Sequence, residues 1–222
     1  VSNHAMSLLL ASARELKRLD LATTTGRWGE VYSRSILNRI YGETVGIIGF
    51  GWIGRAVARK CNTFGMNVIV SDPYVGDHLA IEYGVEFVSK DELLKRSDYV
   101  TLHVPHLDNT HHYIDSKALE AMKPSAYLIN TSRGPVVDEK ALVHALQQNE
   151  IAGAGIDVFE EEPLSPDNPI LKMDNVICTP HVAGSSKIGW ETIRRRAGEE
   201  AARVLRNERP KVVVNPEVLG RI

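Results

Sequence analysis

The chain has 222 residues and carries 26 Lys+Arg against 28 Asp+Glu, a formal net charge of −2. This balance offers no basic surface for nucleic acid or an anionic membrane, and no apolar run approaches the about 20 residues that cross a bilayer. Two cysteines, Cys61 and Cys178, are too few for a disulfide framework or a zinc site. They favour a reducing compartment, so we expect a cytoplasmic protein with neither nucleic acid nor a membrane as its partner.

The first predicted element is an amphipathic helix, because apolar residues recur at a helical period over residues 4–19. We assign residues 1–20 to this long helix and residues 22–42 to a loop that contains Arg27 and Trp28. The apolar side chains of both segments have no obvious core partner in the chain. We therefore expect them to form a homodimer interface, or else to pack on a segment outside this chain.

Strand and helix signals alternate from residue 44 onward. The predicted strands are 44–49, 66–71, 99–104, 126–130, 154–158 and 176–179. The predicted helices are 52–64 closed by Gly65, a short helix capped by Ser89, 116–122, a helix capped by Asp138 that ends at Gln147, and 186–206. Such alternation implies parallel βαβ units, and strands that are apolar on both faces imply helices on both sides. The sequence therefore predicts an α/β fold with a doubly wound parallel sheet.

A glycine-rich motif, Gly49-Phe-Gly-Trp-Ile-Gly54, lies between the first predicted strand and the helix after it. In this context Gly49 allows a tight turn, Gly51 allows the backbone to approach a pyrophosphate, and Gly54 allows helix and strand to pack closely. The free N–H groups and the positive dipole end of the helix also favour phosphate. The motif predicts a Rossmann-type site for a dinucleotide.

An acidic residue, Asp72, ends the second predicted strand, 23 residues after Gly49. A carboxylate at this place can accept hydrogen bonds from both ribose hydroxyls and would repel a 2′-phosphate. The position of Asp72 therefore predicts NAD rather than NADP as the cofactor.

Further polar residues follow the later predicted strands at their carboxyl ends, where ligands bind in an open α/β sheet. These residues are His103 and Pro105; Thr131, Ser132 and Arg133; Asp157 and Glu162; and Pro180 and His181. We expect them to line one crevice with the glycine motif, and we include His103 and Pro105 among the cofactor-binding residues.

The residue types in this crevice fit hydride transfer coupled to proton transfer. His181 is a natural acid/base near neutral pH, and a carboxylate beside it would orient the ring and favour the imidazolium. We assign that carboxylate to Glu162, although chemistry alone does not choose it over Glu160 or Glu161. Arg133 presents a planar fork that suits a substrate carboxylate. This combination predicts interconversion of a 2-hydroxy acid and a 2-oxo acid, and we predict no metal site, because His111-His112 does not have metal-ligand spacing.

The chain resembles the D-isomer-specific 2-hydroxyacid dehydrogenases. The matching segments are VGIIGFGWIGRAVA (45–58), VTLHVPHLDNTHHYI (100–114), LINTSRGPVVDEKAL (128–142), AGIDVFEEEP (154–163) and NVICTPHVAGSS (175–186). The resemblance implies that Arg133, Glu162 and His181 are the catalytic residues. It also implies cofactor contacts at Trp52 and Ile53, Asp72, Thr131 to Arg133, Asp157, and His181 to Gly184.

Members of this family begin with the first part of a flavodoxin-like substrate domain, and that part is absent from this chain. We therefore expect an NAD-binding domain over 1–206 and a tail over 207–222 that returns to the substrate domain. The predicted activity is NAD-dependent oxidation or reduction of a small D-2-hydroxy acid or its 2-oxo acid. The alternative is an NAD-sensing module of the kind found in corepressors that resemble this family; the lack of an extended charged tail favours the enzyme.

Overall fold

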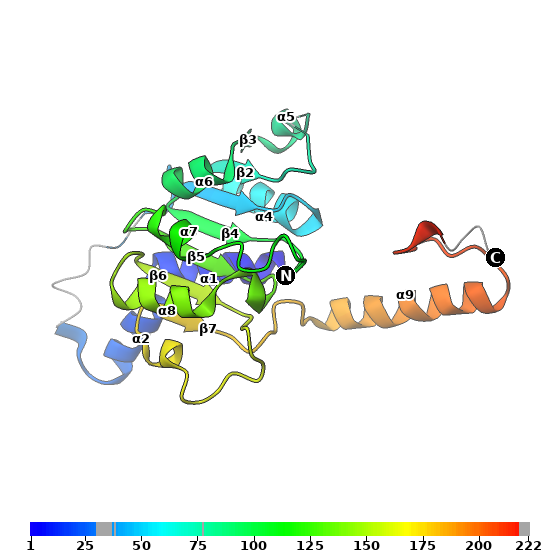
Figure 1. The fold of residues 1–222 in the computed structure, drawn as a ribbon. Helices are drawn as coiled ribbons and strands as arrows, with labels where there is room; N and C mark the ends of the chain where they lie inside the picture. Colours follow the sequence, from blue (N-terminus) through cyan, green and yellow to red (C-terminus); the bar gives the residue numbers. More distant parts are fainter. Residues whose placement is uncertain (30–36, 38, 77, 218–222) are drawn as a thin grey trace. The chain divides into compact units, whose positions relative to one another are not determined.

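The computed structural model describes residues 1–29, 37, 39–76 and 78–217 and is shown in Figure 1. Within these residues the chain forms a parallel seven-stranded sheet with the order β3-β2-β1-β4-β5-β6-β7. The strands are β1 (Thr44–Ile48), β2 (Asn67–Ser71), β3 (Glu86–Phe87), β4 (Tyr99–Leu102), β5 (Tyr127–Asn130), β6 (Gly153–Ile156) and β7 (Val176–Cys178). The strand order reverses between β1 and β4, so the expected doubly wound sheet of the Rossmann type is confirmed.

Helices cover both faces of this sheet (Figure 1). The helices of the part that contains the sheet are α1 (Ser2–Ala13), α2 (Leu16–Thr24), α4 (Trp52–Thr63), α5 (Leu79–Tyr83), α6 (Lys90–Arg96), α7 (Ser116–Glu120) and α8 (Glu139–Gln147), with 3-10 turns η1 (Gly134–Val136) and η2 (Pro169–Lys172). A further helix, α9 (Lys187–Leu205), follows them in the chain. Among the described helices, none has the length and apolar character that crossing a bilayer requires.

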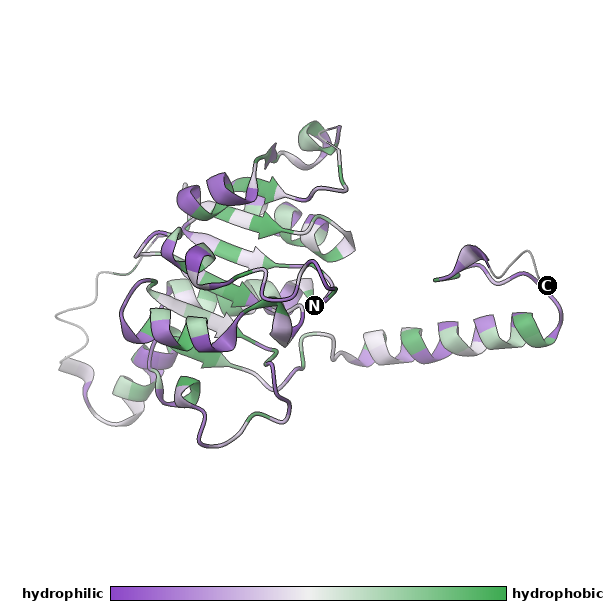
Figure 2. Cartoon of the chain, in the orientation of Figure 1, coloured by the Kyte–Doolittle hydropathy of each residue, from purple (hydrophilic) through white to green (hydrophobic). Residues whose placement is uncertain are grey.

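One hydrophobic cluster lies on each face of the sheet, because successive strand residues point to opposite sides. In β5, Leu128 packs in the cluster under α6, α7 and α8, whereas Ile129 packs in the cluster under α1 and α4. Figure 2 shows the apolar residues concentrated along the strands. Burial on both faces explains why the strands read as continuous apolar runs in the sequence.

The predicted helix starts agree with the structure where a capping side chain is present. The Ser89 hydroxyl accepts a hydrogen bond from the Glu92 N–H, and the Asp138 carboxylate accepts one from the Ala141 N–H. After α4, Gly65 has a φ of 70°, which a glycine adopts without strain. In contrast, β3 has two residues and α5 has five, and these lengths are too short to give a periodic signal.

The single helix predicted over residues 4–19 is wrong, because the chain breaks at Arg14 and Glu15 into α1 and α2. Glu15 adopts a left-handed φ of 47°, which redirects the chain. α1 is buried in the core through residues such as Leu9, whereas Leu16 continues the apolar period but is 51% exposed. The helical spacing of apolar residues therefore continues beyond the residues that are buried in the core. The predicted loop over 22–42 begins only after α2, and its residues 30–36 and 38 lie outside the described part of the chain.

The chain divides into two compact units, Val1–Ala183 and Gly184–Ile222. In the second unit, α9 buries none of its residues. The tail contacts this helix, since the Lys211 N–H donates to Glu200 Oε2 at 2.7 Å and Arg203 pairs with Glu208 at 3.5 Å. This division groups α9 with the tail, whereas the sequence analysis placed it with residues 1–206. The assignment of 207–222 to a substrate domain stays a prediction.

Candidate active site

The glycine-rich turn joins β1 to α4. A Cβ atom on Gly49, whose φ is 92°, would lie 2.7 Å from the His103 carbonyl oxygen, and one on Gly54 would lie 2.2 Å from the Gly49 carbonyl oxygen. No heavy atom lies within 4 Å of the corresponding position on Gly51. Gly49 and Gly54 therefore permit the turn and the close helix packing, while Gly51 leaves the start of α4 open to a ligand. Trp52 follows it and is 94% exposed.

The Asp72 carboxylate lies beside this turn. One oxygen accepts a hydrogen bond from the Phe50 N–H at 2.7 Å, and the other accepts one from the Tyr74 N–H at 2.8 Å. Each oxygen keeps a second lone pair that can accept from a ribose hydroxyl. Asp72 therefore also stabilises the glycine turn, a structural role that the sequence analysis did not predict.

Two buried polar atoms at the ends of β4 and β5 have no hydrogen-bond partner in the described residues: His103 Nδ1 and Thr131 Oγ1. The residues follow Leu102 and Asn130, which are neighbours in the sheet. Burial lowers the pKa of His103 to about 3, so its ring is neutral, and its Nε2 lies 3.0 Å from Thr101 Oγ1. Because buried polar atoms are normally paired, these two can receive polar groups of a ligand. The residues of this edge thus fit a dinucleotide.

Arg133 follows β5 in a turn that Asn130 organises. Asn130 Oδ1 accepts hydrogen bonds from the N–H and hydroxyl of Ser132, and its Nδ2 donates to the Arg133 carbonyl oxygen at 3.1 Å. The exposed Arg133 side chain donates one bond to the Ser132 carbonyl oxygen at 2.6 Å. Asn130 supports the loop that presents Arg133, and the sequence analysis missed this role because Asn130 looked like an ordinary strand end.

Glu162 and His181 form a direct pair, with His181 Nδ1 2.7 Å from Glu162 Oε2. The other carboxylate oxygen accepts from the Phe159 N–H at 3.0 Å. Burial by itself raises the pKa of Glu162, but the hydrogen bonds from His181 and Phe159 outweigh it, and the pKa lies below its ordinary value. Of the three acids that the sequence left open, Glu162 contacts His181, whereas Glu160 contacts His112.

Asp157 is fully buried and holds the turn that carries His181. Its carboxylate accepts hydrogen bonds from Thr179 Oγ1 and from the N–H groups of Val182 and Ala183, at 2.5, 3.0 and 2.8 Å. In addition, His4 Nε2 from α1 lies 3.3 Å from Asp157 Oδ1. The contact of Asp157 with nicotinamide stays a prediction, as does that of Gly184, which begins the second unit. Nothing in the sequence pattern linked His4 to this turn.

A cavity of about 650 Å³ borders the pair on the side of β7. Its lining residues are Phe159, Glu162, Pro163, Leu164, Leu171, Cys178, Thr179, Pro180 and His181. Most of them are apolar, so the Glu162–His181 pair adjoins a mainly apolar hollow.

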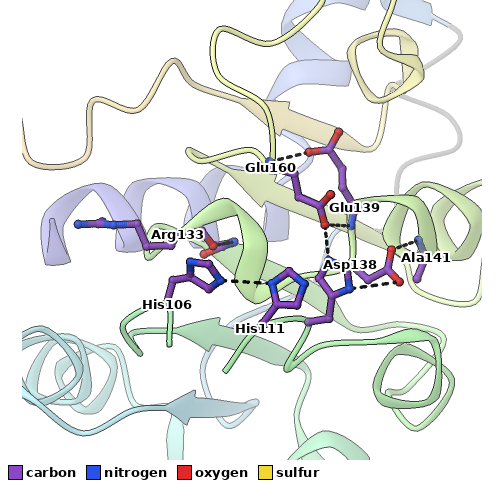
Figure 3. A network of polar contacts seen from close by, with 9 residues as sticks. His106, His111, Arg133, Asp138, Glu139, Ala141 and Glu160 are labelled. Atoms are coloured by element: carbon purple, nitrogen blue, oxygen red, sulfur yellow. Dashed lines mark hydrogen bonds and ion pairs between the residues drawn. The ribbon is translucent and has the colours of Figure 1, made fainter. Parts of the chain in front are cut away.

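A second polar cluster lies beside Arg133 and η1 (Figure 3). His112, Asp138 and Glu160 each place one possible metal-ligand atom within 4.8 Å of the others. The sequence analysis predicted no metal site, because His111-His112 does not have metal-ligand spacing. These three donors come from different loops and have no motif spacing, so only the fold reveals that they lie together.

The fold and this edge define a Rossmann-type dinucleotide-binding domain with an arginine, a carboxylate and a histidine at its crevice. Residues 6–183 match the NAD-binding domain of the D-isomer specific 2-hydroxyacid dehydrogenases. The chain belongs to this family.

Relatives and solved structures agree with this assignment. The chain is 41% identical to a glyoxylate reductase from Korarchaeum cryptofilum, over 98% of this chain and 66% of that protein. It is 41% identical to a D-3-phosphoglycerate dehydrogenase from Methanocaldococcus jannaschii, over 100% of this chain and 43% of that protein. The crystal structure of D-lactate dehydrogenase with NAD+ from Lactobacillus jensenii aligns with a TM-score of 0.86 and 30% identity, covering 96% of this chain and 67% of that one. The chain therefore spans two thirds or less of these proteins.

Proposed function

We propose that this chain is the cofactor-binding part of an NAD-dependent oxidoreductase that interconverts a small D-2-hydroxy acid and its 2-oxo acid. The observation that carries the proposal is the 2.7 Å contact between His181 and Glu162, on the edge of the sheet where the glycine turn lies. An acid/base pair beside a nicotinamide supplies the proton that must accompany each hydride.

The proposed cofactor contacts follow the carboxyl ends of β1, β2 and β4 to β7. They are Gly49, Gly51, Trp52, Ile53, Gly54, Asp72, His103, Pro105, Thr131, Ser132, Arg133, Asp157, His181 and Gly184. The unpaired atoms His103 Nδ1 and Thr131 Oγ1 support this assignment, because both need a partner when buried. Bound NAD would supply or accept the hydride at the substrate carbon. The residues would bind it, orient it and keep water from the reacting atoms.

The catalytic roles divide among three side chains. Arg133 would bind the substrate carboxylate through its planar guanidinium and stabilise charge on the carbonyl oxygen. His181 Nδ1 is engaged by Glu162, so Nε2 is the nitrogen that would donate a proton to the carbonyl oxygen in reduction and accept it in oxidation. Glu162 would favour the charged imidazole through its negative charge.

The assembly and location of the protein are also part of the proposal. Leu16, Leu21 and Trp28 are 51%, 42% and 65% exposed, and such apolar surface favours a homodimer through α1, α2 and the loop after them. Cys61 and Cys178 are both free thiols, which supports a cytoplasmic location.

The test is the oxidation of NADH by the purified full-length protein against a panel of 2-oxo acids, followed by absorbance. Turnover with at least one acid, lost in His181→Ala while NADH still binds, is the expected result. Tight NADH binding without turnover on any acid would contradict the enzyme and favour an NAD-sensing module.

A further inference from the structure

Three loops at the carboxyl edge of the sheet meet at His112. The His112 N–H donates to the Pro135 carbonyl oxygen at 2.8 Å, and the Ile114 N–H donates to that of Val136 at 3.0 Å. These two bonds join the loop after β4 to η1, the turn that directly follows Arg133. The backbone of His112 is thus fixed beside one of the proposed catalytic residues.

The His112 side chain reaches from this place to the turn after β6. Its Nε2 lies 2.7 Å from Glu160 Oε1, and its Nδ1 lies 3.9 Å from Asp138 Oδ2. The His111 ring stacks on it with centroids 4.0 Å apart, and His111 in turn hydrogen-bonds His106 (Figure 3). The imidazole therefore lies between two carboxylates that belong to different loops.

Glu160 is in turn bound to the start of α8. The Glu160 N–H donates to Glu139 Oε2 at 3.1 Å, and the Glu139 N–H donates to Glu160 Oε1 at 3.2 Å (Figure 3). The residue before Glu160 is Phe159, whose N–H donates to the Glu162 carboxylate. Glu160 is therefore bound to α8 directly beside the residue whose N–H holds Glu162.

The middle of this turn has little apolar packing of its own, although Phe159 before it and Leu164 after it contact the hydrophobic cluster. Glu160, Glu161, Glu162 and Pro163 are all exposed. The opposite side of the turn meets Gly134, where an added Cβ would lie 1.8 Å from the Phe159 carbonyl oxygen. Backbone packing against Gly134 thus restricts movement of the turn on one side, and the His112–Glu160 contact restricts it on the other.

We propose that His112 and Glu160 are positioning residues, which hold the turn so that the Glu162 carboxylate meets His181. The inference rests on the proposed function, in which the Glu162–His181 pair moves the proton. Neither residue touches the reacting atoms; both act through the geometry of Glu162.

The first measurement is hydrogen exchange of the Phe159 amide by NMR in this chain, which needs no turnover. This N–H donates to the Glu162 carboxylate at 3.0 Å, so its exchange reports how often the turn opens. In His112→Ala and Glu160→Ala we expect exchange at least about tenfold faster than in the wild-type chain. Glu160→Gln keeps an acceptor for His112 and for the Glu139 N–H, and it should retain the wild-type rate. All samples contain EDTA, because the same donors could bind a metal ion.

The matched control is His144→Ala, which removes an exposed histidine of α8 that lies 4.0 Å from Glu150, and it should leave exchange of the Phe159 amide unchanged. If His112→Ala does not fold, His112→Asn replaces it, because asparagine tolerates the left-handed φ of 47° and is too short to reach Glu160. Wild-type exchange of the Phe159 amide in folded variants of both positions would overturn the proposal.

Kinetics give a second and separate readout. With a 2-oxo acid that the protein reduces, kcat should fall about tenfold in Glu160→Ala while KM changes less than about twofold, and Glu160→Gln should restore most of it. Equal losses in the alanine and glutamine variants would contradict positioning by hydrogen bonds. Absence of turnover in the full-length wild-type protein would contradict the proposed function alone, since the hydrogen-exchange measurement does not depend on it.

Discussion

His181 Nδ1 lies 2.7 Å from Glu162 Oε2, although the two residues are 19 positions apart in the chain. The second oxygen of the same carboxylate accepts from the Phe159 N–H. Glu162 therefore cannot rotate away from His181 without losing a backbone hydrogen bond. This arrangement fixes the tautomer and the orientation of the ring, as an acid/base catalyst requires.

The first prediction concerns the charge of Glu162. Glu162→Gln keeps the size of the side chain but removes the negative charge that supports the imidazolium. The falling limb of the pH–rate profile for 2-oxo acid reduction should therefore move to lower pH. Steady-state rates across the pH range measure this shift. Glu161→Gln changes a neighbouring exposed acid and should leave the limb in place; a limb that moves only in the Glu161 variant would refute the assignment.

A second prediction separates charge from geometry at Arg133. Arg133→Lys retains a positive charge but loses the planar fork, so kcat/KM for 2-oxo acids should fall roughly 10²–10³-fold. The comparison variant is Arg195→Lys, which alters an exposed arginine of α9 paired with Glu199 and should leave kcat/KM within about twofold. A lysine at position 133 that supports near-normal kcat/KM would show that bidentate binding is unimportant.

Much of the carboxyl edge of the sheet, where the candidate site lies, is predictable from the sequence, because it depends on residues close together in the chain. The glycine spacing, the capping residues Ser89 and Asp138 and the apolar strands each specify structure over a few residues, and the structure agrees. The pairing of Glu162 rather than Glu160 with His181 depends on how two loops meet, which chemistry alone left open.

The features that the sequence did not reveal depend on tertiary contacts. His4 reaches Asp157 and Thr179 across more than 150 residues, and His112 meets Asp138 and Glu160 from separate loops. The break at Glu15 was missed for a related reason: the helical period continues through it, and only packing against the sheet shows where the buried face ends.

A third prediction concerns cofactor choice. Asp72 places its carboxylate beside the glycine turn, so the protein should bind NADH at least about tenfold more tightly than NADPH, because a second negative charge is repelled there. Asp72→Asn keeps an acceptor for the Phe50 N–H and should reduce the difference in affinity between NADH and NADPH. Fluorescence titration of both reduced cofactors gives the two Kd values, and equal values for the wild-type protein would contradict the role of Asp72.

Asp157 allows a fourth prediction, on stability. The Asp157→Ala variant leaves the N–H groups of Val182 and Ala183 without their acceptor, and the Ala183 N–H is buried. Unsatisfied buried donors cost about 1–3 kcal/mol each, so the free energy of unfolding in urea should fall by about 2–4 kcal/mol. Asp174→Ala, which removes an exposed acid before β7, should cost less than about 0.5 kcal/mol. Equal losses in both variants would mean that Asp157 does not anchor the turn.

The last prediction uses two glycines of one motif to separate folding from ligand binding. At Gly54 a Cβ would lie 2.2 Å from the Gly49 carbonyl oxygen, whereas at Gly51 no heavy atom lies within 4 Å. Gly54→Ala should therefore destabilise the domain by about 1–3 kcal/mol, as overpacking does. Gly51→Ala should retain the wild-type Tm but weaken NADH binding at least about tenfold, because its methyl group occupies the surface that the pyrophosphate approaches. Thermal unfolding and NADH titration of both variants measure the two effects. A Gly51→Ala protein that binds NADH normally would show that the pyrophosphate does not approach this turn.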